Sequence, residues 1–193
     1  MQDSNIPKDD DSRFNEMQTV KRRLFAMRNG IIADTLRRAG SPYRIIFGVN
    51  LPQLRDIAAD TPHSADLARR LWQNTATRES MLIAPMLMPP DNVTPDDAFE
   101  MMTTCFSTEA ADVLCLRLLR QLPYATDLID RAIKSDDDLT RYCALRLMCN
   151  LLSNYPTKAQ ALAQAELLRQ CALTSSLARM IIATLDDASE GEV

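Results

Sequence analysis

Charged residues recur near the starts of predicted helices, and their positions suit contact with phosphate groups. The chain is expected to form helix pairs, and the second helix of each pair carries one charged residue in its first turns. These residues are Arg78, Asp112, Arg141 and Arg179, at intervals of about 30–40 residues. Such intervals indicate an α-solenoid, in which the starts of equivalent helices line one edge. Polar side chains over a row of helix N-termini would suit a phosphate backbone, so the pattern indicates nucleic-acid binding.

A structural role is the alternative for each of these residues. Asp112 could accept hydrogen bonds at a helix start or pair with Arg141. Arg55, Arg78 and Arg141 could bridge neighbouring repeats without touching a ligand. The acidic run at residues 136–138 is expected to cap a helix, and it would repel a phosphate.

The sequence does not support other chemistries. His63 is the only histidine and follows Pro62 in a predicted loop, and there is no Gly-rich phosphate loop or Gly-x-Ser-x-Gly elbow. The five cysteines are odd in number, and no two have Cys-x-x-Cys spacing. We therefore expect free thiols buried in the core, no metal site and no cofactor. This use of cysteine indicates a reducing compartment, hence the cytoplasm.

Apolar periodicity predicts about ten helices joined by short loops. The composition, with four glycines and abundant Leu, Ala, Met and Arg, favours an all-α fold. Expected helices cover residues 14–28, 31–40, 53–60, 65–74, 78–88, 108–121, 124–134, 137–152, 158–171 and 175–185, and another starts at residue 94.

Local signals mark several helix ends. Ser64 and either Ser107 or Thr108 are expected N-caps, and Pro95 suits a first helical position. Asn29-Gly30 is expected to cap the C-terminus of the first helix, although the first two helices could instead form one kinked helix.

The length of 193 residues predicts a single domain. We expect residues 12–187 to form one helical-repeat domain, residues 1–11 to be a disordered acidic tail, and residues 188–193 to be a flexible tail. No run approaches eighteen uninterrupted apolar residues, and the start lacks the apolar core of a signal peptide. We therefore expect no membrane span and no signal peptide.

Basic residues are concentrated in one part of an acidic chain. The net charge is −4, which by itself argues against nucleic-acid binding. Residues 13–55, however, contain nine basic side chains and only two acidic ones, Glu16 and Asp34. A segregated charge pattern can form one positive face on an acidic protein, so this segment is a candidate DNA-binding surface.

Residues 43–55 form an apolar segment without helical periodicity, bounded by Pro42 and Pro52. Gly48 permits a backbone bend, and Pro52 suits the first turn of a following helix. We expect a tight connector anchored by Phe47 and Val49.

This connector also carries a family resemblance. The string Phe-Gly-Val-x-x-Pro-x-Leu-Arg-x-Ile-Ala, at residues 47–58, resembles the opening signature of the DNA alkylation repair (AlkD-like) family. The similarity continues through Leu71-Trp72 and Arg78-Glu79. It implies a right-handed α-solenoid of HEAT-like helix pairs (an α-α superhelix) that holds duplex DNA on a concave basic face. Arg44, Arg55, Arg78 and Arg179 are the expected DNA-binding residues.

The resemblance also implies an activity, which is hydrolysis of the N-glycosidic bond of N3- or N7-alkylated purines. Matching by motif places Asp112 at the catalytic Asp, which stabilises positive charge on the deoxyribose and positions water, and Arg141, with a one-residue gap, at the Arg that braces the backbone. Thr108 occupies the position of a pocket tryptophan, and the only tryptophan, Trp72, is expected to be a core residue. The alternative is therefore a non-catalytic scaffold that binds DNA structures or another protein.

Overall fold

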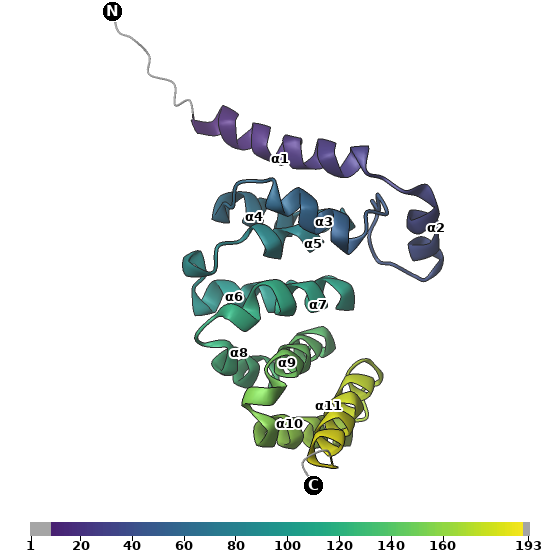
Figure 1. The fold of residues 1–193 in the computed structure, drawn as a ribbon, viewed down its shortest axis with the longest axis vertical. Helices are drawn as coiled ribbons and strands as arrows, with labels where there is room; N and C mark the ends of the chain where they lie inside the picture. The colour runs from purple at the N-terminus through teal and green to yellow at the C-terminus, as the bar shows by residue number, and fades with distance from the viewer. Residues whose placement is uncertain (1–8, 191–193) are drawn as a thin grey trace, which may run out of the picture. The chain divides into compact units, whose positions relative to one another are not determined.

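The computed structural model describes the backbone of residues 9–190 and the side chains of residues 16–188. Over this range the chain forms eleven α-helices and three short 3-10 helices, and its only β-type pairing is an isolated bridge between Ile45 and Thr77. Figure 1 labels the α-helices along the chain. The chain divides into two compact units, Met1–Pro89 (unit 1) and Pro90–Val193 (unit 2). Of the predicted tails at residues 1–11 and 188–193, residues 1–8 and 191–193 lie outside the described residues, whereas residues 9–11 and 188–190 belong to the first and last helices.

Unit 1 contains five helices: α1 (Asp9–Ala26), α2 (Gly30–Arg38), α3 (Leu51–Ala59), α4 (Ala65–Gln73) and α5 (Arg78–Leu87). Helices α4 and α5 pack as a pair, α3 lies against α5, and α1 contacts both α3 and α4. Nine of the ten residues of α5 are buried, so this helix forms the centre of unit 1.

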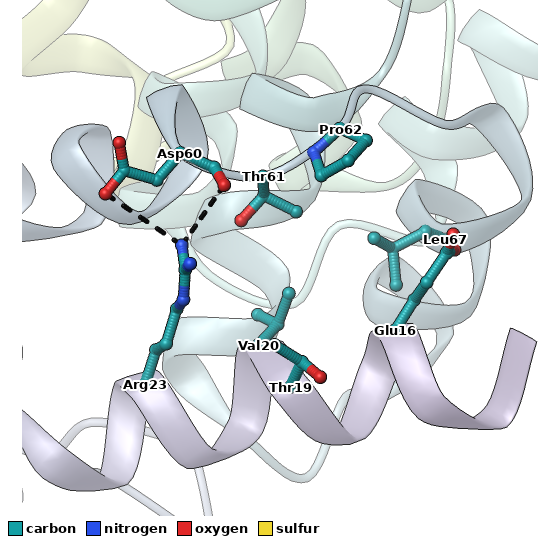
Figure 2. A pocket seen from close by; sticks show the side chains of 8 residues that line it. All are labelled: Glu16, Thr19, Val20, Arg23, Asp60, Thr61, Pro62 and Leu67. Atoms are coloured by element: carbon teal, nitrogen blue, oxygen red, sulfur yellow. Dashed lines mark hydrogen bonds and ion pairs between the residues drawn. The ribbon is translucent and has the colours of Figure 1, made fainter. Parts of the chain in front are cut away.

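Helix α1 is held to the unit by apolar and ionic contacts. Val20 and Leu24 are buried on its inner face. Arg23 donates to the carbonyl oxygen of Asp60 at 3.2 Å and lies 4.0 Å from the Asp60 carboxylate (Figure 2). Beside this contact is a cavity of about 340 Å³ that reaches Leu67 of α4. The side chains of α1 therefore have a fixed orientation relative to α3 and α4.

Unit 2 contains six helices: α6 (Pro95–Thr103), α7 (Thr108–Arg117), α8 (Ala125–Ala132), α9 (Asp138–Asn150), α10 (Pro156–Leu168) and α11 (Ala172–Glu190). The 3-10 helices Pro90–Asn92, Leu119–Gln121 and Leu152–Asn154 lie in its connections. Helix α9 contacts α7, α8 and α11, so it forms the centre of the unit. Its position decides which side chains meet those of α7.

Several predicted helix starts are confirmed. Ser64 caps α4, Ser107 caps α7 and Pro95 begins α6. Asp137, from the predicted acidic capping run, accepts a hydrogen bond from the amide of Thr140 at 2.7 Å. The side chains of Ser64, Ser107 and Asp137 each accept from an N–H group that the helix itself leaves unpaired, and Pro95 has no N–H group to satisfy at its first helical position.

The prediction for Asn29-Gly30 was wrong. Helix α1 ends at Ala26, and Asn29 is the N-cap of α2, accepting hydrogen bonds from the amides of Ile31 and Ile32. The two helices are therefore separate, and the alternative of one kinked helix is also excluded. The predicted helix at residues 53–60 begins two residues earlier, at Leu51, because Asn50 and Gln53 form a capping box.

The connector at residues 43–50 packs closely against the start of α2. Gly48 has a φ of +77°, and a Cβ atom built there would lie 2.1 Å from the carbonyl oxygen of Asn29. Val49 is buried, and Phe47 is half-buried. The position therefore requires glycine both for its left-handed backbone and for lack of space.

Candidate functional site

A cluster of polar side chains joins α7 to α9 in unit 2. Asp112 lies in the second turn of α7 with its side chain 34% exposed. Its Oδ1 atom accepts a hydrogen bond from the Tyr142 hydroxyl at 2.9 Å and lies 2.8 Å from Nε of Arg146. Tyr142 and Arg146 are four residues apart on α9 and therefore present their side chains on one face. We name Asp112, Tyr142 and Arg146 the carboxylate cluster.

The electrostatics of the cluster follow from its partial burial. Burial raises the pKa of the Asp112 carboxyl, although the Tyr142 hydroxyl and the Arg146 guanidinium oppose this effect. Burial and the neighbouring Asp112 carboxylate raise the pKa of the Tyr142 hydroxyl, which therefore remains a donor at neutral pH. The cluster holds a carboxylate in one orientation while a third of its surface stays open to a ligand.

Arg141, predicted to act with Asp112, belongs to a different network. Its side chain is buried, with Nε 3.1 Å from Glu166 and Nη1 donating to the Ser135 carbonyl oxygen at 2.9 Å. Nη2 pairs with Asp138. Glu166 is itself buried and accepts from the Thr174 hydroxyl at 2.8 Å. These contacts connect α9 to α10 and α11, and the arginine that meets Asp112 is Arg146.

Arg78, predicted to bind DNA, is likewise buried. Its Nη1 atom donates to the Val49 carbonyl oxygen at 3.0 Å and to the Glu79 carboxylate at 2.8 Å. Glu79 has no exposed surface and also accepts from the backbone amides of Phe47, Gly48 and Val49. The pair fixes the connector to the start of α5.

The other predicted DNA-binding residues are exposed. Arg44 lies in the connector and Arg55 on α3, both in unit 1, while Arg179 lies on α11 of unit 2. Within the side chains that the structure describes, none of the three forms an ion pair. Each is therefore available to a phosphate oxygen.

Aromatic side chains near Asp112 are few. Thr108 is the first residue of α7, one turn before Asp112, and Phe106 is 42% exposed. Trp72 is buried in unit 1, as predicted for a core residue. The aromatic side chain that touches Asp112 is Tyr142, which does so through its hydroxyl group.

Arg146, Glu79 and Glu166 were not identified from the sequence. The spacing of Tyr142 and Arg146 was a usable signal, because residues four apart on a helix share a face. Glu79 and Glu166 had no comparable signal, since their burial depends on packing between helices. Among the described residues, no group of His, Cys, Asp or Glu could hold a metal ion. All five cysteines are free thiols, and three of them are buried. No described helix is both long and apolar enough to cross a membrane.

Comparisons with known proteins show which family the chain and its fold resemble. The family model described as "DNA alkylation repair enzyme" matches residues 20–187. A solved structure aligns with a TM-score of 0.75 and 19% identity, covering 88% of this chain and 75% of its own. It is described as a new family of proteins related to the HEAT-like repeat DNA glycosylases with affinity for branched DNA structures. The search of curated proteins gave no match. The fold is the all-α, HEAT-like repeat type that the sequence predicted, and the chain belongs to the DNA alkylation repair enzyme family.

Proposed function

We propose that the protein binds duplex DNA and hydrolyses the N-glycosidic bond of N3- or N7-alkylated purine nucleotides. The observation that carries this proposal is the Asp112 carboxylate, which is fixed by Tyr142 and Arg146 and yet 34% exposed. A carboxylate held in this way can face a developing positive charge without reorganising, which is the most effective form of electrostatic catalysis.

Hydrolysis of the N-glycosidic bond of an alkylated purine needs mainly a negative charge beside the deoxyribose. Alkylation gives the purine a positive charge, so the base departs with the electron pair of the bond between C1′ and nitrogen and becomes neutral. The deoxyribose acquires oxocarbenium character, which the Asp112 carboxylate stabilises. Water adds to C1′ and loses a proton, leaving an abasic sugar. Arg146 and Tyr142 act as positioning residues because they orient Asp112.

DNA binding would use the exposed arginines. Arg44 and Arg55 in unit 1 and Arg179 in unit 2 are each free to contact a phosphate, within the part of the chain whose side chains are described. We exclude Arg78 and Arg141 as phosphate contacts, because their guanidinium groups are buried against protein partners. Affinity carried by phosphate contacts should fall steeply as the salt concentration rises.

Release of alkylated bases tests the proposal. On DNA containing N7-methylguanine, the wild-type protein should release the base, and Asp112→Asn should slow release about 10²–10³-fold. Asp91→Asn is the matched control, because Asp91 is an exposed acid of the same unit. Wild-type release no faster than that of Asp112→Asn would remove the enzymatic part of the proposal.

A binding protein without hydrolytic activity is the second candidate. It is favoured by Thr108 at the position where the resemblance implies a tryptophan, which removes one π-face from the pocket. The neutralisation of Asp112 by Arg146 favours it too. This protein would release no base but would bind DNA with a strong salt dependence. A scaffold for another protein would show no DNA binding at any salt concentration.

A further inference from the structure

An open cleft of about 500 Å³ lies between α1 and the connector in unit 1. It is lined by Gln18, Lys21, Arg22, Phe25 and Phe47, and we name these five residues the aromatic cleft. The four residues from α1 follow the i, i+3, i+4, i+7 spacing of one helix face. This face points away from Val20 and Leu24, which are buried. The residues of α1 that line the cleft are therefore separate from Val20 and Leu24, the buried residues of its inner face.

Two phenylalanine rings form the apolar part of the cleft. Phe25 is 54% exposed, and its ring meets that of Phe47 edge to face, with 6.2 Å between the centroids and 90° between the planes. The guanidinium carbon of Arg28 lies 4.1 Å from the centroid of the Phe25 ring. The Arg28 guanidinium therefore lies over one face of the Phe25 ring, and another planar group would stack on the face that Arg28 does not cover.

The rim of the cleft is positively charged. Lys21 and Arg22 are exposed, and neither has an ion-pair partner among the side chains that the structure describes. No carboxylate is among the residues that line the cleft. Its ligand should therefore combine negative charge with a flat apolar group.

The ring of Phe47 sits on a fixed piece of backbone. Its amide donates to Oε2 of the buried Glu79 at 3.0 Å, and its carbonyl oxygen accepts from the amide of Asn29 at 2.8 Å. The next residue, Gly48, packs against the backbone of Asn29 so closely that no Cβ would fit. The connector is therefore ordered before any ligand arrives, which lowers the entropic cost of binding.

We propose that the aromatic cleft binds single-stranded DNA, with an unpaired base stacked on Phe25 and the adjoining phosphates contacted by Lys21 and Arg22. Aromatic side chains beside cationic ones are the general means of holding single strands without reading their sequence. A paired base inside a duplex has no free face to stack, so the cleft favours DNA with unpaired nucleotides. This inference rests on the proposed DNA-binding function and adds a second site, in unit 1, to the carboxylate cluster of unit 2.

The test compares how variants of Phe25 bind single-stranded and duplex DNA. Binding of the full chain to a labelled oligothymidylate and to a duplex of equal length would be followed by fluorescence anisotropy. Phe25→Leu keeps an apolar side chain but removes the π-face, and it should weaken binding to the single strand about tenfold. Binding to the duplex should change less than twofold. Phe25→Trp should retain single-strand affinity, and Ile31→Ala, at an apolar residue of α2 that is 81% exposed, should leave both affinities unchanged.

The outcomes separate this inference from the proposed function. If the wild type binds duplex but not the single strand, the inference is overturned while the proposed function stands. If Phe25→Leu weakens the binding of both DNA ligands equally, or of neither, the proposal that a base stacks on Phe25 is likewise overturned. If the wild type binds no DNA at all, both proposals fail. Circular dichroism of each variant would establish that its helices are intact.

Discussion

The two buried arginine–glutamate pairs and the carboxylate cluster each join a carboxylate to an arginine, but they differ in how far the carboxylate is buried. Glu79 has no exposed surface and accepts from three backbone amides as well as from Arg78. Glu166 is 1% exposed and pairs with Arg141. Asp112, by contrast, is 34% exposed and has two side-chain donors.

The difference separates structural charges from available ones. A buried carboxylate needs its hydrogen bonds filled by protein groups, because leaving any of them unmade is costly in a low-dielectric interior. Such a group has no capacity left for a ligand. A partly exposed carboxylate can be oriented by protein donors on one side and meet a substrate on the other. Position at a helix start therefore does not show whether a charged side chain is open to a ligand, whereas its exposed fraction does.

The largest expected effect is on stability, and it comes from substituting the buried Glu79. Glu79→Gln removes the negative charge opposite Arg78 and turns an N–H₂ group toward backbone amides that are themselves donors. We expect the free energy of unfolding to fall by about 3–5 kcal/mol, the usual effect of removing one member of a buried pair. Urea denaturation measures it. Glu16→Gln, at an exposed residue of α1, should change stability by less than about 0.5 kcal/mol. Equal effects would show that Glu79 has no special structural role.

The two arginines of α9 sharpen the comparison. Arg141→Met leaves Glu166 without its main partner in the interior, so unfolding should become easier by about 3 kcal/mol. Arg146→Met breaks a pair whose members are about one-third exposed and should cost less than about 1 kcal/mol. Base release by the folded protein should show the reverse ranking, with the larger loss in Arg146→Met. If Arg141→Met reduced base release without affecting stability, Arg141 would have a role in the reaction, and our assignment of a structural role to it would be wrong.

Local chemistry explains what the sequence made predictable. Ser64 was predicted as an N-cap, Ser107 as one of two candidates and Asp137 within an acidic capping run, because a cap needs only its own side chain and the next few amides. Asn29 was assigned to the wrong helix, since asparagine suits both ends and only the path of the chain decides between them. The all-α, HEAT-like fold followed from helical periodicity and the connector motif.

The site was predictable only in part. The family resemblance predicted Asp112 and Arg141 as site residues, and a pair between them was the structural alternative, whereas the arginine beside Asp112 in the structure is Arg146. The two arginines are five residues apart on one helix, and the rotation of α9 against α7 determines which of them reaches Asp112. Helix α9 also packs against α11, whose residues are distant from α7 in the sequence, so a local sequence pattern does not fix that rotation. The aromatic cleft was missed because Phe25 and Phe47 belong to different elements, and only the docking of α1 brings their rings together.

The smallest predicted effect concerns the proton of Asp112. Because burial raises its pKa in the folded protein, the folded state binds this proton more tightly than the unfolded state does. The contribution of Asp112 to stability is therefore greatest at low pH and declines as the pH rises through the folded-state pKa. Base release should depend in the opposite way, since only the ionised carboxylate stabilises the cationic sugar, and should fall as the pH drops through the same value. Carbon-detected NMR titration of the carboxyl group measures the pKa directly. The titration midpoint should lie above the ordinary value of 3.8 and rise further in Arg146→Met, because Arg146 opposes the effect of burial. A midpoint at or below 3.8 would mean that Tyr142 and Arg146 stabilise the carboxylate at least as strongly as burial destabilises it, and the predicted rise in the pKa would be wrong.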